Sequence, residues 1–382
     1  MARVPCLLAL CLGLVSACSV ASGSRKVQID RPGLPLADAT AEELDRFKQG
    51  DALFEATLRE SDGLGPLYIR DACAACHAQD GRGPGVVTKV VARQADASLA
   101  TKLLPLGPTV RPYLTAGAKV PLLAPSDPRL QTTARLPPAV FGRGYLEAVA
   151  DKEIQRLSEQ AARRTGSARG RLHRLASGAI GRFGIKARLA TLHDFSADAL
   201  NGDMGITSPS RPDEPAGPEA LRDDRKPGVD FTEPQVELLR DYVRLLEIPQ
   251  RKLPSQNGLA RFEAAECGVC HVPALDTDTA YPIQALAGIS AEIYTDLLLH
   301  DMGEALADGL REENAGPRDF RTAPLIGLRF LPSFLHDGRA KTVEQAILAH
   351  DMPDSEARDS ARKFRALPEH ERAELVKFVE AL

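Results

Sequence analysis

The sequence predicts a mainly α-helical fold in which one helical unit occurs twice. Two helix starts have capping-box spacing, in which a threonine is followed three residues later by Glu or Gln: Thr40 with Glu43, and Thr232 with Gln235. Apolar residues at helical spacing follow both starts. Alternating patterns typical of β-strands are sparse, and 382 residues are enough for two domains with cores of their own.

The repeat is visible in the apolar face of two helices. Four positions after Thr232 recur 136 residues later in the last helix, which opens at Pro368: Leu239, Tyr242, Val243 and Leu246 match Leu375, Phe378, Val379 and Leu382. A glycine before a Phe-Glu pair also occurs twice, as Gly50 before Phe54 and as Gly258 before Phe262. Such self-similarity predicts duplicated small helical domains.

The N-terminus has the pattern of a targeting segment. Arg3 supplies a positive start, and the apolar run from Val4 to Val15 is too short to span a bilayer. The small residues before Cys18 resemble a bacterial lipoprotein processing site. We therefore predict a signal peptide over residues 1–18, a lipid anchor at Cys18, and an exported outer-membrane lipoprotein on the periplasmic side. An ordinary or uncleaved signal peptide is the alternative, and it also exports the protein.

The rest of the chain divides into three predicted parts. Residues 19–37 are a polar tether, 38–250 a first domain with long loop insertions, and 251–382 a second domain. Within the first domain, the Pro/Gly-rich region 81–138 predicts wrapping loops rather than regular strands, and helical patterns resume near residues 145–164. The net charge of -4 is mild and mixed, so no nucleic-acid partner is expected.

Beyond the targeting segment, every cysteine lies in a Cys-x-x-Cys pair that a histidine follows directly: Cys73, Cys76 and His77, then Cys267, Cys270 and His271. Two thiols at this spacing can form thioethers to the vinyl groups of one haem, and the histidine then points at the iron. A zinc ribbon needs its pairs closer in sequence, and a redox dithiol needs a βαβ setting that is absent here. We expect two covalently bound haem c groups, with His77 and His271 as iron ligands, in two cytochrome c-like domains.

The ligand on the other side of each iron separates an enzyme from an electron carrier, because an open position permits substrate chemistry. The histidines and methionines available for it are His173, His193, His300, His336, His350, His370, Met204, Met302 and Met352. We expect His173, in a basic run, and His370, in the first turn of the last helix, to be solvated.

Residues 331–350 resemble the C-terminal signature of bacterial di-haem cytochrome c peroxidases, with Leu331-Pro-Ser-Phe-Leu-His-Asp-Gly-Arg followed by His350. The chain is more closely similar to the di-haem oxidoreductase family, some of whose members are labelled thiol oxidoreductases. This resemblance covers about residues 45–382 and rests on several blocks: Asp62–Leu67, Arg135–Ala148, Gly181–Ala187, Gly202–Thr207, Asp296–Gly303 and Phe320–Leu325.

The resemblance implies roles for residues around the second haem. The peroxidases ligate that iron with a methionine at the position of His350, so we expect a bis-histidine iron held by His271 and His350. His336 would lie near the haems without binding iron, either as a catalytic relay or as a hydrogen-bond donor to a propionate. Arg339 would pair with a haem propionate. The family leaves room for a Ca²⁺ ion between the haems, which this sequence does not support.

The resemblance also makes the first haem the catalytic one. Asp203 lies where the family has an acid that moves protons during O–O cleavage, although it could instead cap a turn. Met204 is a rival that would close the iron, and Phe195 stands where the family often has Gln.

Three functions remain open on these residues. We favour a peroxidase-like enzyme in which a cytochrome or cupredoxin donor, soluble or in the membrane, passes electrons through the second haem to hydrogen peroxide at the first. The alternative is a lipid-anchored di-haem electron carrier without substrate turnover. The third is an oxygenase or radical-forming relative, for which Tyr294 or another aromatic would replace the absent tryptophan.

Overall fold

The computed structural model describes residues 31–81, 83–93, 102–215, 217–218, 228–252 and 255–382. The predicted signal peptide, the Cys18 anchor and the first part of the tether lie outside these ranges. Within them, no helix combines the length and the apolar character needed to cross a membrane.

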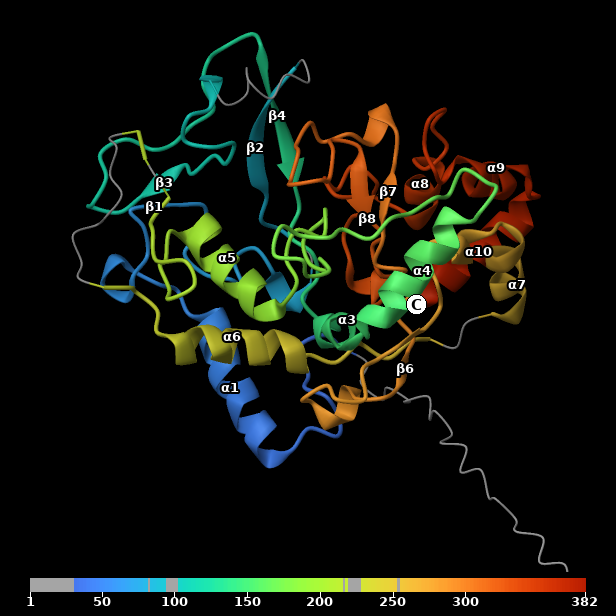
Figure 1. Ribbon diagram of the computed structural model, residues 1–382, viewed down its shortest axis with the longest axis horizontal. Helices are drawn as coiled ribbons and strands as arrows, with labels where there is room; N and C mark the ends of the chain where they lie inside the picture. Colours follow the sequence, from blue (N-terminus) through green and yellow to red (C-terminus); the bar gives the residue numbers. More distant parts are fainter. Residues whose placement is uncertain (1–30, 82, 94–101, 216, 219–227, 253–254) are drawn as a thin grey trace, which may run out of the picture.

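Helices are the main regular elements of the described residues, as predicted (Figure 1). They are α1 (Ala41–Glu55), α3 (Arg143–Ala148), α4 (Asp151–Ala162), α5 (Leu192–Met204), α6 (Glu233–Leu245), α7 (Gln256–Ala264), α8 (Val343–Leu348), α9 (Arg358–Ala366) and α10 (Glu369–Ala381). Short strands form four antiparallel pairs: β1 (Leu67–Tyr68) with β3 (Tyr113–Leu114), β2 (Val87–Ala92) with β4 (Leu130–Arg135), β5 (Leu275–Asp276) with β6 (Ser290–Ala291), and β7 (Leu299–Asp301) with β8 (Asp319–Arg321).

The expectation of loops without regular strands over residues 81–138 is wrong. The six residues of β2 pair with the six of β4 in one ladder, from Val87 opposite Arg135 to Ala92 opposite Leu130. β2 reads Val-Thr-Lys-Val-Val-Ala, and β-branched side chains favour an extended, pleated backbone. The abundant proline and glycine around these twelve residues concealed the strands.

Both predicted capping boxes are present. The Thr40 hydroxyl accepts from the Glu43 backbone N–H at 3.2 Å, and the Glu43 carboxylate accepts from the Thr40 N–H at 2.7 Å. Thr232 and Gln235 cap α6 in the same way, with proline in the first turn of that helix. These contacts begin both helices at the residues that the sequence indicated.

The sequence repeat is also a repeat of helix packing. A Cβ added to Gly50 of α1 would lie 2.3 Å from the Leu238 carbonyl oxygen and 2.7 Å from Tyr242 Cβ of α6. A Cβ on Gly258 of α7 would lie equally close to the matching positions of α10, 2.6 Å from the Glu374 carbonyl oxygen and 2.5 Å from Phe378 Cβ. Each pair therefore crosses at a glycine, as the neighbouring ribbons of α1 and α6 illustrate (Figure 1).

Among the described residues, the buried apolar side chains form one large cluster, a smaller one, and a third group of three residues, Ala187, Leu299 and Ala315. The large cluster takes residues from both predicted domains, among them Phe141, Leu246, Leu286 and Ile293. The smaller cluster joins α7, α9 and α10 through Phe262, Phe364 and Phe378. The boundary near residue 250 and the cytochrome c-like character of each half stay predictions.

Candidate functional site

The second Cys-x-x-Cys-His motif follows α7 and ends in an oriented histidine. His271 Nδ1 donates to the Tyr294 carbonyl oxygen at 3.1 Å. A carbonyl can only accept, so Nδ1 carries the proton and Nε2 is left as a base, the form in which imidazole binds a metal. Burial and, to a smaller extent, the nearby His350 lower the pKa of His271 to about 4, so the ring is neutral at pH 7.

The His350 ring is oriented by the same kind of hydrogen bond. His350 follows α8, and its Nδ1 donates at 2.6 Å to the Ala346 carbonyl oxygen one turn earlier. Burial lowers the pKa of this ring as well, so His350 is also neutral with a free Nε2. The structure thus brings together the two histidines that the sequence paired.

His271 and His350 line one cavity of about 300 Å³, together with Cys267 and Cys270. Most of the remaining wall is apolar, and Phe262, Leu328 and Ile347 are part of it. The cysteines of both motifs are free thiols rather than disulfides. Two thiols, two imidazoles with free Nε2 atoms and apolar walls fit a haem with two axial histidines.

The first motif follows α1, and its histidine, His77, is also neutral. The Ala74 backbone N–H donates to the Phe54 carbonyl oxygen at 3.2 Å, which ties the motif to the end of α1. Burial lowers the pKa of His77 to about 4, and its Nδ1 has no hydrogen-bond partner among the described residues. The Phe54 ring lies 6.0 Å from the His77 ring, centroid to centroid.

Asp203 lies beside this first motif, in the last turn of α5. Burial raises the pKa of its carboxyl group, and the nearby cations Lys89 and Arg111 oppose that rise. The Cys73 and Cys76 thiols have raised pKa values, chiefly through burial and next through the Asp203 charge. The residue named from the sequence as the proton-moving acid is therefore close to both cysteines.

The two other candidates on α5 have apolar surroundings. Met204 is buried in the large core cluster, where Phe195 packs at its edge. The Phe195 ring lies 6.2 Å from the Phe183 ring. Phe195 therefore gives this part of the site an apolar side chain where the family often has an amide.

Residues 125–382 match a family model described as "Di-haem oxidoreductase, putative peroxidase". The chain belongs to the di-haem oxidoreductase family. Haem is therefore the cofactor of this chain. Its function is that of a peroxidase-like oxidoreductase. No curated protein matches the chain.

Two solved structures are similar to this di-haem oxidoreductase at low identity. One is hydrazine synthase of Kuenenia stuttgartiensis, with 12% identity, a TM-score of 0.43 and full coverage of both chains. The other is a MauG-like protein associated with microbial copper homeostasis, with 15% identity, a TM-score of 0.41, and coverage of 93% of this chain and 92% of that one. At these scores neither adds to the argument.

His336 also lines the cavity of this di-haem oxidoreductase. Its ring stacks on Phe320 with the centroids 4.5 Å apart, and its Nε2 has no hydrogen-bond partner among the described residues. Burial lowers the pKa of His336 to about 4, so the ring is neutral. Arg339 instead donates to Asp337 at 2.6 Å and is not among the described residues that line this cavity.

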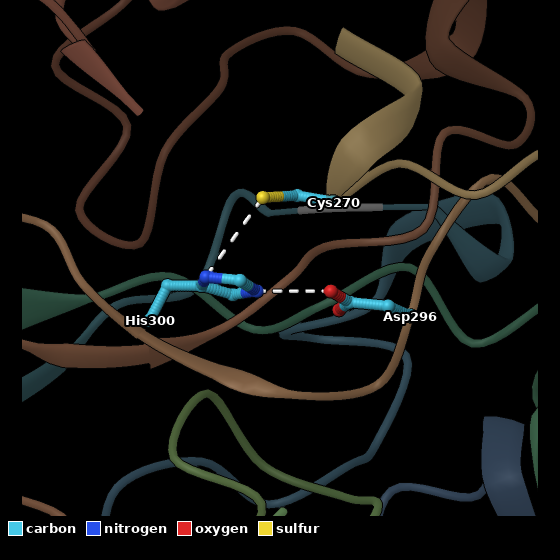
Figure 2. Close-up of side chains that lie close together, drawn as sticks. All are labelled: Cys270, Asp296 and His300. Atoms are coloured by element: carbon cyan, nitrogen blue, oxygen red, sulfur yellow. Dashed lines mark hydrogen bonds and ion pairs between the residues drawn. The ribbon is translucent and has the colours of Figure 1, made fainter. Parts of the chain in front are cut away.

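His300 lies beside Cys270 in a charged network that the sequence did not reveal (Figure 2). Its Nε2 faces Asp296 at 2.9 Å, its Nδ1 faces Glu356 at 2.7 Å, and the Cys270 sulfur is 3.8 Å away. Burial opposes a charge on this ring, yet the Cys270 side chain and the two carboxylates raise the pKa of His300 well above its ordinary value. A thioether at Cys270 would remove the largest of these contributions and leave the Asp296 and Glu356 carboxylates as the groups that favour a charged His300 ring.

The remaining histidines are not near-haem candidates. His173 is buried, with Nδ1 donating to the Lys186 carbonyl oxygen at 2.8 Å, so the expectation that it is solvated is wrong. Its basic neighbours Arg171 and Arg174 are exposed, whereas the His173 ring lies against Lys186, which is itself fully buried. His370 is exposed, as expected, and His193 pairs with Glu233 at 2.6 Å.

Proposed function

We propose that this di-haem oxidoreductase is an exported enzyme with two covalently attached c-type haems, which reduces hydrogen peroxide at the first. Cys73 and Cys76 hold one haem, and the second motif holds the other. The observation that carries the proposal is the unlike surroundings of the two motifs. A second imidazole, His350, lines the same cavity as His271, whereas a carboxyl group, Asp203, lies close to Cys73 and Cys76.

At the second motif, His271 and His350 together would fill both axial positions of a haem, which suits electron transfer rather than substrate binding. Residues 136–143 support a path from there to the first motif. Pro138, Ala139 and Arg143 line the cavity of the second motif, and both the Pro138 backbone and the Arg143 charge lie close enough to His77 to shift its pKa. Electrons from a small cytochrome or cupredoxin would enter at the second haem and pass to the first.

A haem with an open axial position supplies the redox chemistry that splits an O–O bond. Asp203 serves that reaction as a proton carrier, because one peroxide oxygen loses a proton and the other gains one. Its raised pKa keeps a larger share of the acid form near neutral pH than an exposed aspartate would. The positive charges of Lys89 and Arg111 stabilise the Asp203 carboxylate after its proton has left.

Steady-state turnover tests this function. The purified holoprotein should oxidise two equivalents of a reduced donor cytochrome for each hydrogen peroxide consumed. A bis-histidine second haem also suits the alternative, a lipid-anchored electron carrier. That alternative predicts electron exchange with the donor and no peroxide consumption, and this result would reject the peroxidase proposal.

A further inference from the structure

The side-chain hydroxyl of Tyr242 distinguishes the two repeated helix pairs at one of their matched apolar positions. Tyr242 of α6 occupies the position that Phe378 occupies in α10, 136 residues later. The two rings pack alike, with Tyr242 5.0 Å from Phe54 and Phe378 5.3 Å from Phe262, centroid to centroid. Phenylalanine is therefore sufficient for the packing, and the hydroxyl of Tyr242 needs another explanation.

The Tyr242 hydroxyl donates a hydrogen bond to a carboxylate next to the first motif. It donates to Asp80 Oδ1 at 2.5 Å, and Tyr242 and Asp80 are 1% and 6% exposed. The Asp80 backbone N–H donates to the His77 carbonyl oxygen, which fixes the carboxylate at the end of the motif. Gly33 closes the other side, since a Cβ there would lie 2.7 Å from Asp80 Oδ2. The pair is thus a dry phenol–carboxylate contact.

A series of tilted ring contacts connects this pair to His77, the proposed iron ligand of the first motif. Phe54 lies between the Tyr242 ring, at 5.0 Å, and the His77 ring, at 6.0 Å. Tyr145 and Tyr281 also donate to carboxylates, those of Glu247 and Glu147. Among the described residues, however, Tyr242 is the tyrosine whose ring contacts lead to a motif histidine.

We propose that Tyr242 is a redox-active tyrosine that stores one oxidising equivalent for the first haem, with Asp80 as the acceptor of its proton. The inference rests on the proposed function, because a peroxide is the oxidant that creates the electron vacancy at the haem site. The tryptophan-free chain gives the role to a tyrosine.

The step balances in atoms and electrons. Tyr242 gives one electron to the oxidised haem site, which is reduced by one electron. The phenolic O–H bond breaks as the proton moves along the hydrogen bond, an O–H bond forms on Asp80, and the phenol becomes a neutral phenoxyl radical. One electron from a one-electron donor then returns to the ring with the same proton and restores the phenol. The substrates that suit such a store are donors that give up one electron at a time.

Freeze-quench electron paramagnetic resonance of the holoprotein with hydrogen peroxide tests the assignment. We expect an organic radical signal whose hyperfine splitting collapses when the protein carries ring-deuterated tyrosine. Tyr242→Phe should abolish the signal while haem content and the optical spectrum stay unchanged, since the second copy already carries phenylalanine there. Tyr281→Phe is the matched control, because it also removes a hydrogen bond from a tyrosine hydroxyl to a carboxylate. The Tyr281 ring faces Arg244, so this variant should keep the radical signal.

The optical spectrum recorded on the same samples separates the two proposals. A haem spectrum that peroxide does not change would reject the proposed function and this inference with it. A haem spectrum that changes without a tyrosyl signal, or with a signal that survives in Tyr242→Phe, would overturn the inference alone. Asp80→Asn keeps an acceptor for the hydroxyl but is no proton acceptor, so it should reduce the yield of the radical.

Discussion

The Nδ1 atoms of His271 and His350 each donate to a backbone carbonyl, and this small detail decides what both residues can do. Each ring is held with Nε2 free, so neither needs to reorganise to bind iron. The family resemblance placed both residues near one haem. It could not show the orientation of the rings, which depends on Tyr294 and Ala346.

Replacing His350 by methionine tests this ligation. We expect the reduction potential of the second haem to rise, on the order of 0.1 V within the range of about 0.8 V that axial ligands set, because thioether ligation favours the reduced iron. Spectroelectrochemical titration measures the potential. His370→Met, at an exposed position, should leave it unchanged. An unaltered potential in His350→Met would show that His350 is not a ligand.

Asp203→Asn removes the proposed proton carrier and keeps the size of the side chain. We expect kcat/KM for hydrogen peroxide to fall by about 10²–10⁴, the usual contribution of general acid–base catalysis. Stopped-flow measurement of the haem reaction separates this step from electron delivery. Asp213→Asn, at an exposed position near the same helix, should react at the wild-type rate. A wild-type rate in Asp203→Asn would remove Asp203 from the mechanism.

His336 should make stability depend on pH. Its pKa in the folded protein is about 4, below the 6.5 of the free side chain, so the unfolded state binds more protons between these values. Stability is therefore full above pH 6.5 and falls as the pH drops toward 4, by about 2 kcal/mol between pH 7 and pH 5. Urea unfolding at both pH values should show that loss in the wild type and a smaller one in His336→Phe. Equal losses in the two proteins would mean that His336 is not buried as a neutral ring.

Two glycines determine how closely the repeated helices approach. The capping boxes were readable from the sequence because each joins residues three positions apart, and the repeat because one local pattern occurs at two places in the chain. The strands β2 and β4 were not, because proline and glycine dominate the composition around them and their pairing joins residues about forty positions apart. The glycine crossings themselves became interpretable only once each helix had its partner.

Gly258→Ala should destabilise the second helix pair. The new Cβ would lie 2.5 Å from Phe378 Cβ and 2.6 Å from a backbone oxygen, so α7 and α10 must separate, at a cost of about 1–3 kcal/mol. Gly202→Ala is the matched control, because it lies in α5 with nothing within 4 Å of the added Cβ. That variant should be neutral or more stable by up to about 1 kcal/mol, since alanine favours helix. Thermal unfolding of both holoproteins gives the comparison, and equal melting temperatures would contradict the packing account.

At the scale of the whole molecule, the two motifs were predictable and the groups between them were not. Cys-x-x-Cys-His is a local signature, so both sites could be found in the sequence. The Tyr242–Asp80 bond joins residues 162 positions apart, and the His300–Glu356 bond joins residues 56 apart. Contacts of this kind depend on how the chain folds back on itself, which one sequence does not reveal.

The central claim is that the two haem sites of this molecule differ, with one closed by two histidines and one open beside an acid. Electron paramagnetic resonance of the oxidised and half-reduced holoprotein, before and after hydrogen peroxide, reports the spin state of both irons in one experiment. Our account predicts one low-spin bis-histidine haem that peroxide leaves in place, and one haem that is high-spin, or becomes so on half-reduction, and reacts with peroxide. Two low-spin haems that stay inert to peroxide in every redox state would contradict it.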